Sequence, residues 1–177
     1  MLITSPSYKL IPQFTKTPGY HVTAGWDYLC EHWIPENVKE GGLQLDPDFQ
    51  RVHCWTEDKQ VQYIEYIMRG GISGRNIYFN HPGWMKSFKG EFVLVDGKQR
   101  IEAVRRFMEN EIKAFGWLYE DFRKTRKILS MDCHFDLWIN DLPTRKDVLQ
   151  WYLDLNTGGV VHTTAEIEKV RKMLEAE

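Results

Sequence analysis

The chain has 177 residues, of which 42% are hydrophobic and 14% aromatic, and this suits one domain of ordinary size with a sizeable core. Its net charge of −2 excludes a generally basic nucleic-acid coat, although residues 84–130 carry 11 Lys and Arg against 7 Asp and Glu. There is no apolar run of membrane-spanning length, no signal-peptide pattern and no CxxC pair among the three cysteines, so we expect a cytoplasmic protein with reduced thiols and no membrane partner.

The first third of the chain predicts an arm followed by short elements. Residues 1–19 contain three prolines and are expected to form an extended N-terminal arm, ahead of a single domain at 20–177. A strand is expected at 20–22, and then a helix with Thr23 as its N-cap, which either ends or starts another turn at Pro35. After a break at the glycine pair 41–42, the pattern predicts a short strand at 43–45 and an ordered loop at 46–55.

The middle of the chain has the clearest hydrophobic periodicity. Helices are predicted at 56–69, closed by a glycine pair, and at 98–110, with strands at 76–80 and 91–95 between them. The second helix is expected to turn four apolar residues inward, namely Ile101, Val104, Phe107 and Met108.

Towards the C-terminus, strands are predicted at 114–118 and 134–139 and a helix at 144–156. Thr163 and Glu166 form a capping box for a last helix that runs to about residue 174. Strands and helices alternate, but the strands are short and several connections are long. The predicted fold is therefore a compact α+β domain rather than a doubly wound α/β sheet.

One junction concentrates features that favour phosphate binding. A buried apolar strand runs into Asp96-Gly97, and a helix follows that opens with Lys98, Gln99 and Arg100. A helix start attracts anions, Gly97 permits a close backbone approach, and Arg100 offers a planar fork for phosphate oxygens. Asp96 could hold a metal ion or a ribose hydroxyl. Taken alone, the pattern is equally typical of an ordinary strand–helix turn with solvated cations.

Two further segments carry candidate site residues. The loop segment Phe-Gln-Arg at 49–51 leaves Arg51 free to reach a neighbouring site, unless it is a surface arginine above Phe49 and Trp55 in the core. The segment at 155–159 contains Asn156, whose amide is both donor and acceptor. The alternative for this second segment is a helix C-cap.

Together these three patterns resemble one family. The chain has, in order, Phe-Gln-Arg followed by Trp, then Asp-Gly-x-Gln-Arg, then Asn-Thr-Gly before a capped helix. This order resembles the DGQQR-motif N-terminal domain of GmrSD-type, modification-dependent restriction enzymes, which belong to the ParB/sulfiredoxin-like group. The resemblance extends over roughly residues 20–175. It implies a ParB-like domain with a small mixed sheet flanked by helices, which binds and often hydrolyses a nucleotide on or beside DNA. Lys98 stands where this family usually has glutamine.

The resemblance also implies roles for individual residues. Its catalytic candidates are Gln50, Asp96, Gln99 and Arg100. Its nucleotide-binding candidates are Arg51, Gly97, Lys98, Arg100 and Asn156. On this hypothesis a nucleoside triphosphate lies over the helix start, its phosphates meet the cations, Asp96 coordinates Mg²⁺, and Gln50 or Gln99 orients the attacking water.

The resemblance also has limits. Restriction enzymes of this type carry a separate C-terminal nuclease domain, for which this chain has no room, so we expect a module without its own nuclease, as would suit a phage or mobile element. Sulfiredoxin-type chemistry is not expected, because no cysteine lies between Cys54 and Cys133.

The main alternative is a non-catalytic module that binds nucleic acid or a host protein, as an accessory or inhibitor. Aromatic residues at 117, 119 and 122 precede a basic run, a mixture that single-strand binders use. The cations of this run are Arg123, Lys124, Arg126 and Lys127. A solvated helix or loop with core aromatics explains the same pattern. The sequence leaves open which nucleotide binds, if any, and the oligomeric state.

Overall fold

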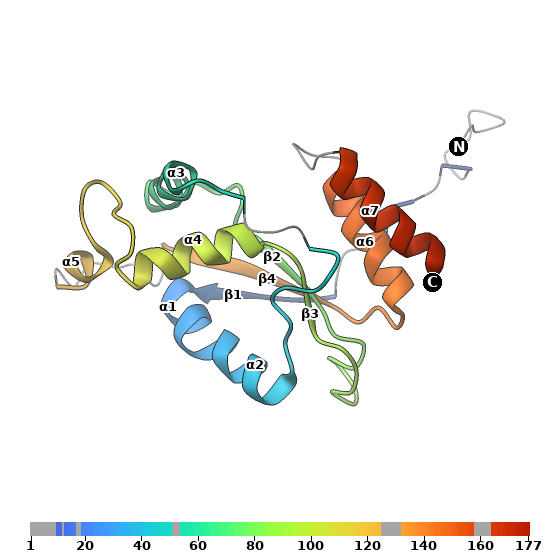
Figure 1. Cartoon of the computed structure of the whole chain (residues 1–177). Coiled ribbons are helices and arrows are strands. Elements are labelled where there is room, and N and C mark those ends of the chain that lie inside the picture. Colours follow the sequence, from blue (N-terminus) through green and yellow to red (C-terminus); the bar gives the residue numbers. More distant parts are fainter. Residues whose placement is uncertain (1–9, 12, 17–18, 51–53, 125–131, 158–163) are drawn as a thin grey trace.

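The computed structural model describes residues 10–11, 13–16, 19–50, 54–124, 132–157 and 164–177 (Figure 1). Its centre is a four-stranded mixed sheet with the order β1-β4-β2-β3. The strands are β1 (Tyr20–Gly25), β2 (Asn76–Asn80), β3 (Val93–Asp96) and β4 (His134–Asn140). Strand β4 runs antiparallel to β1 and parallel to β2, and β3 is antiparallel to β2.

Helices cover the sheet in two groups (Figure 1). The first group comprises α1 (Trp26–Tyr28), the π-helical turn η2 (Leu29–Trp33), α2 (Ile34–Gly41), α3 (Glu57–Met68), α4 (Lys98–Met108) and α5 (Tyr119–Lys124). The second group is the pair α6 (Arg145–Thr157) and α7 (Thr164–Ala176), which pack on each other.

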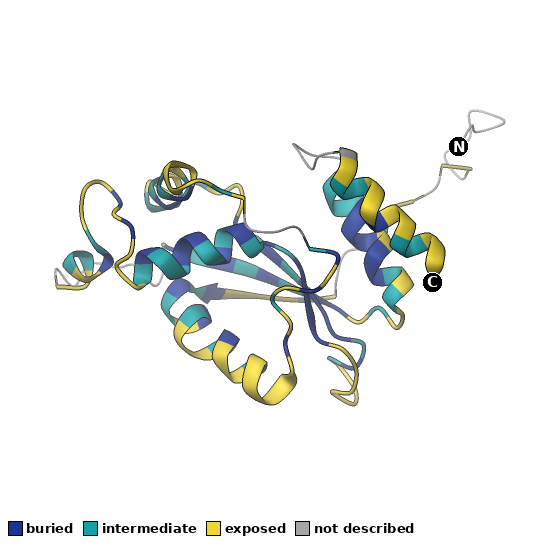
Figure 2. Ribbon diagram, viewed as in Figure 1, coloured by how far each residue is buried: buried dark blue, intermediate teal, exposed yellow. Residues whose placement is uncertain are grey.

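These groups build two hydrophobic cores, one on each face of the sheet. Side chains alternate along a strand, so β3 directs Leu94 into the main core and its valines, Val93 and Val95, into the second. The main core joins β2, β3 and β4 to α1–α5, and the second joins β3 to α6 and α7. Strand β3 is therefore buried on both faces (Figure 2), which fixes the position of the residues that follow it.

The α+β class predicted from the sequence is confirmed, as are the strongly periodic elements. Strand β2 and helices α3, α4 and α6 lie within a residue or two of the predicted bounds. Thr56 caps α3 by accepting a hydrogen bond from the Lys59 backbone N–H at 3.4 Å. In α4, the predicted inward residues Ile101, Val104 and Phe107 are buried, and Met108 is partly buried.

Other predictions are wrong for identifiable reasons. Thr23 does not cap a helix, because it lies in β1 and its hydroxyl donates to Asp136 Oδ1 at 2.9 Å. For Pro35, the second of the two predicted alternatives is confirmed: it starts another turn, in the first turn of α2, where its missing N–H costs nothing. Residues 43–45 contribute only a single bridge, between Gln44 and Val93.

The segment at 114–118 is a tight turn and not a strand. Ala114 and Trp117 bridge each other, and Phe115 and Gly116 between them have φ angles of 51° and 80°, which no strand accommodates. Helix α5, which directly follows this turn, was predicted from the sequence only as one alternative, a solvated helix or loop with core aromatics.

The described part of the N-terminal segment lies against α6. The backbone N–H and the hydroxyl of Thr15 both donate to Asp154 Oδ2 at 2.8 Å. The proposed capping residue Thr163 lies outside the described residues. Among the described helices, none is both long and apolar enough to cross a bilayer. The three cysteines are free thiols.

Candidate functional site

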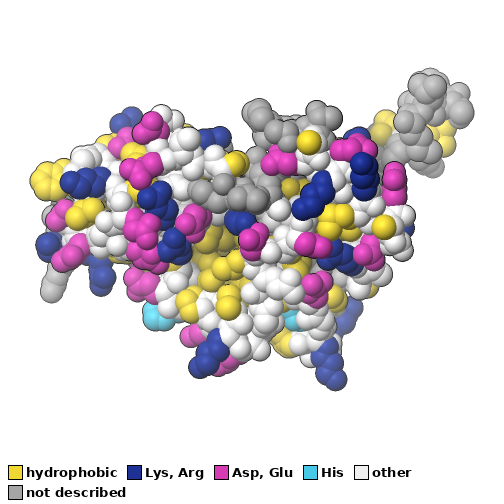
Figure 3. Space-filling view, in the orientation of Figure 1, with side chains coloured by type: hydrophobic (Ala, Val, Ile, Leu, Met, Phe, Trp, Pro, Cys, Tyr) yellow, Lys and Arg dark blue, Asp and Glu magenta, His cyan; other side chains and the backbone are white. Residues whose placement is uncertain are grey.

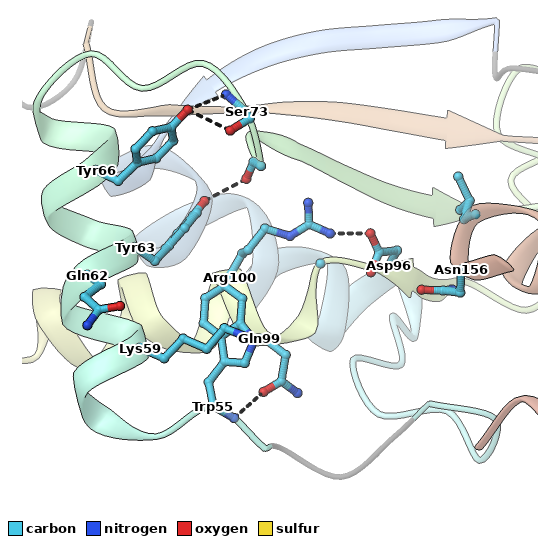
Figure 4. A pocket seen from close by; sticks show the side chains of 13 residues that line it. Trp55, Lys59, Gln62, Tyr63, Tyr66, Ser73, Asp96, Gln99, Arg100 and Asn156 are labelled. Carbon is cyan, nitrogen blue, oxygen red and sulfur yellow. Dashed lines mark hydrogen bonds and ion pairs between the residues drawn. The ribbon is translucent and has the colours of Figure 1, made fainter. Parts of the chain in front are cut away.

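A cavity of about 920 Å³ opens where α3, the β3–α4 junction and the end of α6 meet (Figure 4). This volume falls in the usual range for small-ligand pockets. The lining residues are Trp55, Lys59, Gln62, Tyr63, Tyr66, Ser73, Gly74, Asp96, Gly97, Gln99, Arg100, Leu155 and Asn156. Three elements that are distant in the sequence thus enclose one space.

The β3–α4 junction is built on Gly97. Its φ of 114° lies in a region that L side chains avoid, and an added Cβ would lie 2.5 Å from Ile77 Cδ1 on β2. The Gly97 carbonyl accepts hydrogen bonds from the backbone N–H groups of Arg100 and Ile101, both at 3.0 Å, so α4 begins directly after the strand. Because Gly97, Gln99 and Arg100 line the cavity, the positive end of the helix dipole opens onto it.

Arg100 and Asp96 form an ion pair inside the cavity. The guanidinium Nη2 of Arg100 donates to Asp96 Oδ2, and the two side chains are 17% and 31% exposed. Figure 4 shows the Arg100 side chain extending across the cavity to Asp96, with Asn156 on the other side of the carboxylate. The pair holds the guanidinium in a fixed orientation and leaves its remaining N–H groups for a ligand.

Gln99 is only 6% exposed and makes two hydrogen bonds to the segment before α3. Its Oε1 accepts from the backbone N–H groups of Cys54 at 2.9 Å and Trp55 at 3.1 Å. Its Nε2 is buried and has no acceptor among the described residues. A buried donor without a partner costs about 1–3 kcal/mol, which a bound water or a ligand atom that accepts from Nε2 would remove.

Helix α3 contributes an aromatic wall. The rings of Trp55 and Tyr63 meet edge to face at 5.4 Å, and Lys59 Nζ lies 5.1 Å from the Trp55 ring centre. The Tyr63 hydroxyl donates to the Gly74 carbonyl at 2.9 Å, and burial raises the pKa of this phenol. The hydrogen bond to Ser73, at 2.7 Å, lowers the pKa of Tyr66.

The sequence did not predict this wall. Its α3 members, Lys59, Gln62, Tyr63 and Tyr66, have the i, i+3, i+4, i+7 spacing of one helix face. A polar-aromatic stripe at this spacing was therefore present in the sequence, beside the apolar stripe that predicted the helix.

Five of the residues predicted for the site line the same cavity, namely Asp96, Gly97, Gln99, Arg100 and Asn156. The Asn156 side chain donates through Nδ2 to the Tyr152 carbonyl at 2.7 Å, which fixes its orientation at the end of α6.

Three other predicted residues are not among the described lining of the cavity. Gln50 Nε2 donates to the carbonyls of Leu94 at 3.0 Å and Val95 at 2.8 Å, so its amide ties the loop to β3. The Lys98 ammonium pairs with Asp46 and borders a separate, mostly apolar cavity of about 250 Å³. Arg51 lies outside the described residues.

The described part of the basic run, on α5, lies at the opposite end of α4 from the cavity (Figure 1). Arg123, on α5, lies 5.9 Å from the Tyr119 ring centre, and Lys124 pairs with Glu120 at 3.4 Å and Asp121 at 3.7 Å. Arg126 and Lys127 lie outside the described residues. On the face shown in Figure 3, cationic and anionic side chains are interspersed, as the low net charge requires.

The comparison with protein families gives one match. The model of the GmrSD restriction endonuclease N-terminal domain matches residues 36–137, which include β2, β3, α3, α4 and every cavity residue except those from α6. No curated protein and no solved structure gives a significant match. The mixed sheet is compatible with a ParB/sulfiredoxin-like grouping. Since the family match covers more than half of the chain, and the site motif with it, the chain belongs to the family of the GmrSD restriction endonuclease N-terminal domain.

Proposed function

We propose that this restriction-enzyme domain binds a nucleoside triphosphate in the cavity between α3, α4 and α6, and hydrolyses it with Mg²⁺. The observation that carries the proposal is that one cavity combines a helix N-terminus, an oriented arginine, a buried amide donor without a partner and an aromatic wall. Each of these features matches a different part of a nucleotide.

The triphosphate would lie at the start of α4. The backbone N–H groups of Arg100 and Ile101 already donate to the Gly97 carbonyl, so a phosphate at the helix start would meet those of Lys98 and Gln99. The helix dipole favours negative charge there. Arg100 supplies a guanidinium whose position Asp96 already fixes, so little side-chain entropy is lost when a phosphate binds. Lys98 contributes at most its backbone N–H to this site, because its ammonium pairs with Asp46.

The base and sugar would lie towards α3 and α6. Trp55 and Tyr63 offer apolar ring surface, and an aromatic side chain stacks on any nucleobase. Gln99 Nε2 is a donor for an acceptor atom of the ligand, and Asn156 faces the same space from α6.

The donor set suits a metal that arrives with its nucleotide. Asp96 is the single carboxylate among the described lining residues, and no cluster of three His, Cys, Asp or Glu side chains suited to a metal occurs in the described parts of the chain. Mg²⁺ is commonly held by one or two carboxylates together with substrate phosphates, which fits this arrangement. Asp96 would hold the metal, which would neutralise charge on the phosphates.

The two glutamines take different roles in this proposal. Gln99 contacts the ligand or the attacking water through its Nε2, while its Oε1 holds the segment before α3. Gln50 positions the site indirectly, because its amide bonds the backbone of β3 immediately ahead of Asp96.

The domain would act on or beside DNA, as the family's description as a restriction endonuclease suggests. The alternative is a module that binds nucleic acid or a host protein without nucleotide turnover.

Release of phosphate from ATP, GTP and CTP, with and without Mg²⁺, distinguishes these two functions. We expect Mg²⁺-dependent turnover, reduced about 100-fold or more by Arg100→Ala, because a single electrostatic donor typically contributes about 2.7–4 kcal/mol. Arg105→Ala is the matched control, since Arg105 lies on the same helix but pairs with Glu102 outside this cavity. Equal turnover by wild type and Arg100→Ala would refute the assignment of the site. If the wild type neither binds nor hydrolyses a nucleotide, the proposed function is excluded and the alternative, a module that binds nucleic acid or a host protein, remains.

A further inference from the structure

The loop at 81–90, which joins β2 to the residues before β3, exposes two large apolar side chains in a rigid setting. Met85 and Phe88 are each 67% exposed. Figure 1 shows the loop projecting from the end of the β2–β3 pair, away from α3 and the start of α4. Two large apolar side chains three residues apart on one loop form a small exposed apolar patch, and such patches can mark interaction sites.

The loop is held by its own hydrogen bonds. The backbone N–H groups of Lys86 and Phe88 both donate to the Gly83 carbonyl, at 3.0 Å and 2.8 Å, and the Trp84 N–H donates to the His81 carbonyl at 3.0 Å. These bonds close the chain into a compact turn. The apolar tip is therefore presented in one shape rather than collapsed onto the surface.

Aromatic packing supports the same shape from beneath. The Phe88 ring meets Trp84 edge to face at 5.6 Å, and Trp84 in turn packs on Tyr20 and Phe92. Gly90 closes the loop, because its φ is 128° and a Cβ there would lie 2.9 Å from Pro82 Cγ. The side of Phe88 that faces solvent is thus backed by a rigid cluster.

Phe88 also has an unfavourable backbone conformation. Its φ of 49° lies in the left-handed region, which costs a bulky side chain more than it costs glycine or asparagine. A large aromatic residue thus occupies a position where glycine or asparagine would fit the backbone better. Strain of this kind is typical of positions selected for binding rather than for stability.

The charges around the tip favour an anionic partner. Lys86 and Lys89 flank Phe88. Within the described parts of the chain, Lys86 pairs only with Asp141, at 3.7 Å, and Lys89 makes no ion pair. Figure 3 shows Lys or Arg side chains where this loop projects at the lower edge of the molecule. Apolar wedges flanked by cations are what DNA-bending proteins insert between base steps.

We propose that this loop is a DNA contact, in which Phe88 and Met85 insert at a base step while Lys86 and Lys89 meet the flanking phosphates. The proposal goes beyond nucleotide binding and does not depend on it, because the loop and the cavity share no residue. It does draw on the family match, which includes this loop.

The test is binding of the full chain to a short fluorescent duplex, measured by anisotropy, with a second duplex that carries 2-aminopurine as a reporter of unstacking. We expect Phe88→Ala to weaken binding about tenfold and to abolish the rise in 2-aminopurine fluorescence. Lys86→Gln with Lys89→Gln should lower the slope of log affinity against log salt by about two.

Phe115→Ala is the matched control, because Phe115 is also a phenylalanine with a left-handed φ, of 51°, and is 40% exposed, but lies on another surface. Phe88→Asn separates binding from folding, since asparagine tolerates the left-handed backbone, and we expect it to melt no lower than Phe88→Ala while binding DNA as weakly.

Three results would overturn the proposal. The first is a wild type that does not bind duplex DNA. The second is equal loss of binding in the Phe88 and Phe115 variants. The third is an unchanged DNA affinity in Phe88→Ala, when the same change abolishes either binding to anionic lipid vesicles or self-association of the chain.

Discussion

Replacing Gly97 with alanine tests whether the close contact between the start of α4 and β2 sets the geometry of the site. The backbone φ of 114° makes any L side chain unfavourable there, at about 1–3 kcal/mol. The new Cβ would also lie 2.5 Å from Ile77 Cδ1 and 3.1 Å from its Cγ2, and overpacking of this kind costs about 1–3 kcal/mol. We therefore expect the free energy of unfolding to fall by about 2–6 kcal/mol, measured by urea denaturation.

Gly42→Ala is the control for backbone strain alone. Gly42 follows α2 with a φ of 65°, but a Cβ there would meet nothing within 4 Å, so only the strain should appear. Ile77→Val removes the Cδ1 atom at the closest contact and costs about 0.5–1.5 kcal/mol by itself. The double variant Gly97→Ala/Ile77→Val should lose less than the sum of its single changes. Strict additivity, or equal losses at positions 97 and 42, would refute the steric explanation.

Further predictions concern Gln99 and the thiols. Gln99→Glu retains the acceptor for the Cys54 and Trp55 N–H groups but removes the Nε2 donor, so we expect nucleotide affinity to fall at least about tenfold in a calorimetric titration, by analogy with the loss of one buried hydrogen bond; unchanged affinity would show that Nε2 does not meet the ligand. A thiol reagent near neutral pH should modify the exposed Cys54 quickly and the more buried Cys30 and Cys133 slowly, and rapid reaction of a second thiol in the native protein would contradict this. Burial raises the pKa of Cys30 from 9.0 to about 12, so between these two pH values the folded protein keeps a proton that the unfolded chain loses. The free energy of unfolding is therefore unaffected by this thiol below pH 9 and falls as the pH rises towards 12. Cys30→Ala should reduce this alkaline fall, measured as the melting temperature. An identical alkaline fall in both proteins would exclude that contribution.

The part of the site that is local in the sequence could be predicted, because one strand, one turn and one helix start create it. Asp96, Gly97 and Arg100 lie within five residues, and their roles follow from the chemistry of a helix N-terminus. The wall from α3 could not be placed in the same way. It depends on α3 packing beside α4, and nothing local in the sequence specifies which face of α3 turns towards that junction.

The error at Thr23 has the same origin. Thr23 has the residue type of a helix cap, yet its partner is Asp136, 113 residues further along, and pairing with β4 decides its conformation. Tertiary contacts likewise decide where the site candidates lie: the Gln50 amide bonds the backbone of β3, and Lys98 pairs with Asp46. A residue type predicts what a side chain can do, whereas the packing of distant elements decides which cavity it faces.

The central claim is that a nucleoside triphosphate lies in the cavity with its phosphates at the start of α4. A crystal structure of the chain with Mg²⁺ and a non-hydrolysable triphosphate tests it most directly. We predict phosphate oxygens within hydrogen-bonding distance of Arg100, and the base against Trp55 and Tyr63. A nucleotide bound at any other surface, or a cavity that stays empty at saturating nucleotide, would contradict the account.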